Sequence, residues 1–87
     1  MTKPDHWDRI TVVLVTRNSE AILPLSLGSL AGARRIILID AMSTDDTIAV
    51  ARASHPAVEV LSLTEDRGLG AATNKGFALV DTEYVLN

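Results

Sequence analysis

The chain has 87 residues, of which 47% are hydrophobic and 22% charged, and its formal net charge is −3 at pH 7. This length suits one small domain, and the apolar fraction excludes an intrinsically disordered chain. The negative charge argues against a nucleic-acid-binding surface, because phosphate contacts need clustered lysine and arginine. The sequence holds no cysteine, which excludes a disulfide framework and a thiolate metal site and agrees with a reducing compartment.

Residues 1–9 form a polar N-terminal tail of mixed charge, without the basic-then-apolar layout of a signal peptide. No apolar run approaches the ~20 residues that a membrane-spanning helix needs. We therefore expect a cytoplasmic chain, and attachment to the cytoplasmic face of a membrane through a longer parent protein stays open. His6 and His55 have no partner at metal-ligand spacing, so we expect both at the surface.

A first strand is predicted over residues 10–15, because a nearly continuous β-branched run is typical of a strand buried on both faces. A polar turn follows it. A helix is then expected over about 22–31, with Pro24 in its first turn, where a missing N–H costs little, and Gly32 at its end.

The second predicted strand covers residues 35–39 and stops abruptly at the carboxylate of Asp40. Ser43 or Thr44 is expected to cap the next helix, which continues to about residue 54. The two acidic residues after Thr44 suit the positive end of the helix dipole.

The rest of the chain repeats this alternation. A third strand is expected over residues 58–63, nearer the sheet edge because its apolar and polar residues alternate. After a loop over 64–69, a helix is predicted over 70–80, weakened by Gly76, and a fourth strand over 83–86.

The predicted order βαβαβαβ implies an α/β, Rossmann-like fold, in which helices cover both faces of a parallel sheet to form three layers. Such folds bind ligands at the carboxyl ends of their strands, so Asp40 is expected beside a ligand. Because the sequence ends within the fourth strand, we expect the fold to be truncated there and the chain to be part of a longer protein.

Four segments carry motifs that match a known family. They are VLVTRNS at 13–19, ILIDAMSTD at 37–45, EDRGLGAATNKG at 65–76 and EYVLN at 83–87. Together they resemble, in order and spacing, the N-terminal half of family 2 glycosyltransferases with the GT-A fold, and within that family the rhamnosyltransferases. The resemblance identifies residues 10–87 as a partial GT-A nucleotide-sugar-binding domain.

The resemblance implies transfer of a sugar from a UDP- or dTDP-sugar to an acceptor hydroxyl, usually with inversion, in cell-surface polysaccharide biosynthesis. The implied acceptor is a glycan or a lipid-linked molecule. Mg²⁺ or Mn²⁺ would neutralise the departing diphosphate, held by an acidic motif expected just beyond Asn87. The general base also belongs to the C-terminal half of the family, so we expect these 87 residues alone to be inactive.

Matched position by position, the resemblance implies a nucleotide-sugar site. Its residues are Thr16, Arg17, Asn18, Asp40, Ser43, Asp45, Arg67, Gly68 and Asn74.

In that site Asp40 would hydrogen-bond the uracil or thymine ring, and Thr16 would meet the base. Arg17 stands where tyrosine is common, and its guanidinium would stack on the base or meet a phosphate. For Asn18 a turn-forming role competes with a place beside the ligand. The alternative for Asp40 is that it is a solvated residue at the end of a strand, with no contact to a ligand.

For Ser43 and Asp45, helix capping competes with nucleotide contact. Gly68 would allow close backbone approach to the nucleoside, and Arg67 would reach the base or a phosphate. Asn74 would orient the loop and the ligand. Asp66, where the family has asparagine, is expected to cap a turn instead.

Two other functions stay open. A dinucleotide-dependent enzyme would also place an acid such as Asp40 after its second strand, but the turn after the first strand lacks the glycines that a pyrophosphate needs. Alternatively, the chain is a non-catalytic module that binds nucleotide or forms homo-oligomers through an exposed sheet edge.

Overall fold

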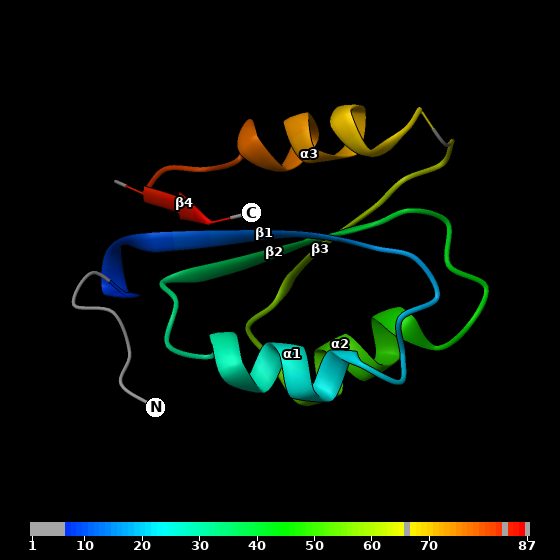
Figure 1. The fold of residues 1–87 in the computed structure, drawn as a ribbon, viewed down its shortest axis with the longest axis horizontal. Helices are drawn as coiled ribbons and strands as arrows, with labels where there is room; N and C mark the ends of the chain where they lie inside the picture. Colours follow the sequence, from blue (N-terminus) through cyan, green and yellow to red (C-terminus); the bar gives the residue numbers. More distant parts are fainter. Residues whose placement is uncertain (1–6, 66, 83, 87) are drawn as a thin grey trace.

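A parallel four-stranded sheet with the order β3-β2-β1-β4 organises the protein (Figure 1). The structure is a computed structural model that describes residues 7–65, 67–82 and 84–86. The strands are β1 (Ile10–Thr16), β2 (Arg35–Asp40), β3 (Glu59–Ser62) and β4 (Tyr84–Leu86). A short 3₁₀ turn, η1 (Trp7–Arg9), precedes β1.

Helices cover both faces of this sheet. In Figure 1, α1 (Leu23–Leu30) and α2 (Thr47–Ser54) lie side by side below the strands, and α3 (Leu69–Phe77) lies above them. The predicted α/β, Rossmann-like, three-layer fold is therefore confirmed. Among the described residues, no helix has the length and apolar character that crossing a bilayer requires.

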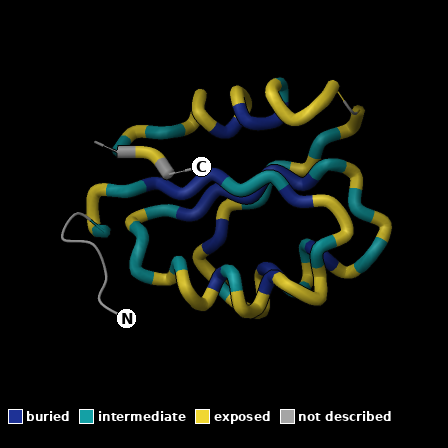
Figure 2. Tube along the Cα trace, viewed as in Figure 1, coloured by how far each residue is buried: buried dark blue, intermediate teal, exposed yellow. Residues whose placement is uncertain are grey.

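Successive side chains of the central strands point alternately into two separate hydrophobic cores, because the pleat of a strand places neighbours on opposite faces. Towards α1 and α2, the buried apolar side chains are Val12, Leu23, Leu27, Ile36, Leu38, Ala51 and Val58. Towards α3 they are Val13, Ile37, Ile39 and Ala72. Figure 2 shows these buried stretches in dark blue along the strands. Burial on both faces explains why the two central strands are almost continuously apolar between their ends, with Thr11 as the buried polar exception.

The strands lie close to their predicted positions, and the first two extend further than expected. β1 includes Thr16 and β2 includes Asp40, so both polar residues belong to the strand ladder. β3 lies at one end of the sheet order, as its alternating pattern predicts.

The second helix differs from its prediction. It begins at Thr47 with Asp46 as its N-cap residue, so the prediction that Ser43 or Thr44 caps it is wrong. The physical reason is that the hydroxyl of Ser43 donates to Asp40, while the N–H groups of Thr44 and Asp45 donate to the side chain of Asn18.

The third helix is shifted towards the N-terminus of its predicted range, because Val80 N–H turns back to the carbonyl of Phe77. Its Gly76 is buried against the sheet, where a Cβ atom would overlap Cγ1 of Val13 and touch Ile39. Glycine has a low intrinsic helix propensity, but at this position its missing side chain allows α3 to pack close to β1 and β2.

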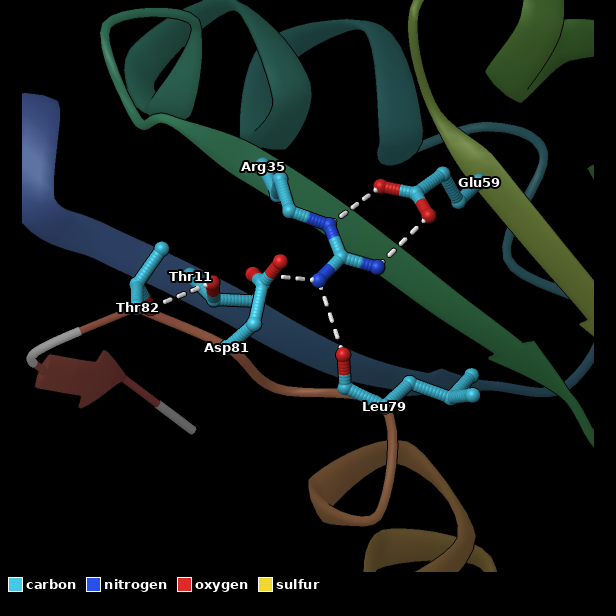
Figure 3. Close-up of polar contacts among 6 residues, drawn as sticks. All are labelled: Thr11, Arg35, Glu59, Leu79, Asp81 and Thr82. Carbon is cyan, nitrogen blue, oxygen red and sulfur yellow. Dashed lines mark hydrogen bonds and ion pairs between the residues drawn. The ribbon is translucent and has the colours of Figure 1, made fainter.

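An ion-pair cluster ties together the amino end of the sheet (Figure 3). Arg35 donates two hydrogen bonds to the carboxylate of Glu59 in β3, each 2.7 Å, and reaches the carbonyl of Leu79 and Oδ1 of Asp81, also at 2.7 Å. Beside it, the hydroxyls of Thr11 and Thr82 lie 2.6 Å apart. These contacts hold the segment between α3 and β4 against the sheet.

Candidate functional site

The carboxyl ends of three strands come into line at one edge of the sheet. Thr16 pairs in register with Asp40, and Asp40 pairs with Ser62. The loops that leave these strands emerge on the same side in Figure 1. We call this edge the rim: the ends of β1, β2 and β3 together with the β1–α1 loop (residues 17–22), the β2–α2 loop (41–46) and the segment that leads into α3.

Asp40 is almost fully buried at the rim, with 3% of its surface exposed. One carboxylate oxygen accepts the N–H of Ser43 at 3.0 Å, and the other accepts the Ser43 hydroxyl at 2.6 Å and the Thr16 hydroxyl at 3.4 Å. The alternative of a solvated strand-end residue is therefore wrong. The carboxylate closes the turn after β2.

Thr16 is also buried, with 7% of its surface exposed. Its carbonyl accepts the N–H of Ala41 at 2.8 Å, which continues the β1–β2 pairing one residue into the next loop. Strand alternation places the side chains of Thr16 and Asp40 on the face covered by α1 and α2, together with Leu38.

Asn18 links two loops. Its side-chain oxygen accepts the N–H of Thr44 at 2.8 Å and of Asp45 at 3.3 Å, and its own N–H donates to the Ser43 hydroxyl at 2.8 Å. Its φ of 50° is left-handed, a conformation that asparagine tolerates better than most residues. The turn-forming role considered for Asn18 is thus present in the structure.

Asp45 links the same two loops at a second point. One carboxylate oxygen accepts the N–H of Glu20 at 3.3 Å, and the other accepts the N–H of Thr47 at 2.9 Å and the Thr47 hydroxyl. Hydrogen bonding by Thr47 is the main cause that holds the pKa of the Asp45 carboxyl below its usual value. The Thr47 hydroxyl also accepts the N–H of Ser19 at 2.8 Å, a role that the sequence reading missed.

The other predicted site residues lie exposed. Arg17 follows β1 directly, and Gly68 precedes α3 with a left-handed φ of 88°. Arg67 forms an exposed ion pair with Glu65 at 2.8 Å. Asn74 lies on the exposed side of α3, and Asp66 falls outside the described residues.

A hollow of about 300 Å³ lies between α3 and the end of β3 with the loop that follows it. Its apolar lining comes from Leu61, Leu63, Ala71 and Ala72, and its polar lining from Ser62, Thr64, Glu65, Arg67 and Lys75. Of the predicted site residues, Arg67 lines it. Lys75 was missed, although its helical spacing from Ala71 and Ala72 places the three on one face.

The hollow and the Asp40 carboxylate lie on opposite faces of the sheet, since Leu61 and Leu63 pack with the core under α3. The rim therefore has a polar, hydrogen-bonded part over α1 and α2, and a part-apolar recess beside α3. The described residues hold no group of three or more histidine, cysteine, aspartate or glutamate side chains that would bind a metal ion.

Sequence comparison places these features in a family. Residues 11–87 match the sequence profile described as Glycosyl transferase family 2. Curated proteins from Mycobacterium bovis and Mycobacterium tuberculosis, each named as an uncharacterised glycosyltransferase, are 39% identical over 79 residues, which is 90% of this chain and 34% of theirs. The chain thus spans about a third of the length of these relatives.

Structural comparison agrees. Glucosyl-3-phosphoglycerate synthase of Mycobacterium tuberculosis superposes with a TM-score of 0.74 at 28% identity, covering 87% of this chain and 32% of that one. Its complex with UDP gives a TM-score of 0.75, and its complex with Mn²⁺, UDP-glucose and phosphoglyceric acid gives 0.74. The chain belongs to glycosyl transferase family 2.

Proposed function

We propose that this chain supplies the donor-nucleotide part of an enzyme that transfers a sugar from a UDP- or dTDP-sugar to an acceptor hydroxyl with inversion. The observation that carries the proposal is the alignment of Thr16, Asp40 and Ser62 at one sheet edge, the place where open α/β folds bind nucleotides. The structural relative binds UDP and UDP-glucose, so UDP is the first donor to test.

The proposed site keeps the residues matched from the family. We place Arg17, Arg67, Gly68 and Asn74 beside the nucleotide and its diphosphate, and their exposure would let them reach it. Both arginines would balance the negative charge of a diphosphate. Thr16 and Asp40 are buried at the rim, where their hydrogen bonds hold the β2–α2 loop in place for the nucleotide.

A metal ion and a general base come from other parts of the whole protein in this proposal. The described residues offer no metal-binding cluster, and the structural relative was solved with Mn²⁺ together with UDP. We therefore assign Mg²⁺ or Mn²⁺ binding, and the general base, to residues after Asn87.

The proposed acceptor is a glycan or a lipid-linked molecule, and the proposed setting is the cytoplasm, since a cysteine-free sequence suits a reducing compartment. A rhamnosyl donor, carried on dTDP, is the specific alternative to a glucosyl donor on UDP.

Titration calorimetry on the full-length protein tests the proposal, with UDP and dTDP as ligands and Mn²⁺ present. Saturable binding of one of them is expected, and ADP and NAD serve as controls for the dinucleotide alternative. A sugar-transfer assay on residues 1–87 alone should show no turnover. Turnover by this segment, or binding of NAD in place of UDP and dTDP, would contradict the proposal.

A further inference from the structure

The two loops above α1 and α2 are joined by side-chain hydrogen bonds that form a continuous chain. Asp40 accepts a hydrogen bond from the Ser43 hydroxyl, and the oxygen of the same hydroxyl accepts a hydrogen bond from the N–H of Asn18. Asn18 in turn accepts the N–H groups of Thr44 and Asp45. We call the set Asn18, Asp40, Ser43 and Asp45 the loop clasp.

Each member of the loop clasp satisfies backbone groups that ordinary secondary structure leaves unpaired. The N–H groups of Asn18, Ser43, Thr44 and Asp45 all lie outside helix and strand, and each finds a side-chain acceptor in the loop clasp. The carboxylate of Asp45 also accepts a hydrogen bond from the N–H of Glu20 in the β1–α1 loop. Unpaired polar groups in such loops would let the loops fluctuate between several conformations.

We propose that Asn18 is a positioning residue of the nucleotide site: through its side-chain oxygen it holds the β2–α2 loop against the β1–α1 loop, and it acts on the nucleotide through that loop. The inference rests on the proposed function. In this proposal Asn18, Ser43 and Asp45 act on the nucleotide indirectly and do not contact it. The reason is that their side-chain oxygens accept hydrogen bonds from N–H groups of the protein.

The effect on binding follows from a population argument. A ligand binds with an apparent affinity reduced by the fraction of protein in the competent conformation. The side-chain oxygen of Asn18 accepts one short backbone N–H bond, from Thr44 at 2.8 Å, and one long bond, from Asp45 at 3.3 Å. Losing this acceptor should lower the competent fraction about tenfold, which corresponds to about 1.4 kcal/mol for the two bonds together.

The test compares two substitutions that both tolerate the left-handed φ of Asn18. Asn18→Gly removes the acceptor without backbone strain, and Asn18→Asp keeps an acceptor oxygen but removes the amide donor. Ser29→Ala in α1 is the matched control, because its hydroxyl bonds only to the carbonyl of Ser26 among the bonds that the structure describes. All variants are made in the full-length protein.

Two measurements are needed. Amide hydrogen exchange of Thr44 and Asp45 should become faster in Asn18→Gly and stay near wild type in Asn18→Asp. Affinity for UDP should fall about tenfold in Asn18→Gly, and affinity for uridine, an uncharged probe, should return close to wild type in Asn18→Asp. Uridine is used because the new carboxylate would repel a diphosphate.

Unchanged exchange in Asn18→Gly would overturn the inference. So would an Asn18→Asp variant that protects the loop but binds uridine as weakly as Asn18→Gly, because the amide donor would then contact the nucleoside directly. A wild-type protein that binds neither UDP nor dTDP, and neither uridine nor thymidine, would instead reject the proposed function, and with it the nucleotide role of the loop clasp. The two failures are therefore distinguishable.

Discussion

The backbone of Gly76 in α3 lies directly against the side chain of Val13 in β1, with no room for a Cβ atom between them. This contact sets how closely α3 approaches the sheet. Because Gly68 and Arg67 lead into the same helix, the position of α3 also decides where the recess beside it lies.

Gly76→Ala should destabilise the protein by about 1–3 kcal/mol, because the new methyl group overlaps Val13 in a close-packed core. Gly28→Ala is the matched control, since Gly28 lies in α1 with no neighbouring atom within 4 Å of the new Cβ. That control should gain about 0.5–1 kcal/mol from helix propensity. Urea unfolding of both variants decides: equal effects of the two substitutions would mean that α3 does not pack as described.

Asp40→Ala should weaken UDP binding and lower the free energy of unfolding by about 1–3 kcal/mol, because it leaves the N–H and hydroxyl of Ser43 without their acceptor. Calorimetry with UDP and urea unfolding provide the two measurements. Asp46→Ala is the control: its side chain makes no capping hydrogen bond, and its effect should stay within about 0.5 kcal/mol. UDP binding that is equal in wild type and Asp40→Ala would remove Asp40 from the site.

The pair of Arg35 and Glu59 should give a pH-dependent contribution to stability. Hydrogen bonds from Arg35 hold the pKa of the Glu59 carboxyl below its usual value. A group whose pKa is lower in the folded state stabilises the fold above its unfolded pKa of about 4.3, and that contribution is lost as the pH falls through the folded value. The pKa of Arg35 is raised, so its own contribution is lost only in strong alkali.

Glu59→Gln should therefore be less stable than wild type at neutral pH, by at most about 1 kcal/mol because the pair is partly exposed. The difference should shrink as the pH falls below about 4. Thermal unfolding across this pH range measures it, with Glu65→Gln at the exposed pair with Arg67 as the control. A difference that grows on acidification would show that the sign of the linkage is wrong.

Residues 1–87 in isolation should self-associate. In the described residues β4 lies at the end of the sheet order, and Phe77, Leu79 and Val85 near it are 40%, 47% and 46% exposed. Open strand edges and adjoining apolar surface favour association between copies. Light scattering over a concentration series should show dimers or larger species, and a monomer at every concentration would contradict this prediction.

Local sequence patterns were sufficient for the element order. The apolar runs at 10–15 and 35–39 are long enough for strands and too short for free-standing helices, and glycine and proline mark the exit and entry of the first helix. Since parallel strands separated by helices form a sheet covered on both faces, the α/β class and the shared rim follow from this order alone.

Tertiary contacts decided what the polar residues do. Asn18 bonds to residues 25 to 27 positions away, and Arg35 to residues up to 46 positions away, so no local pattern records either arrangement. Likewise, the helix cap expected at Ser43 failed because Asp40 and Asn18 both use its hydroxyl. Periodicity and turn preference report the conformation of neighbouring residues, whereas the partner of a polar side chain depends on which distant segments the folded sheet brings within hydrogen-bonding distance.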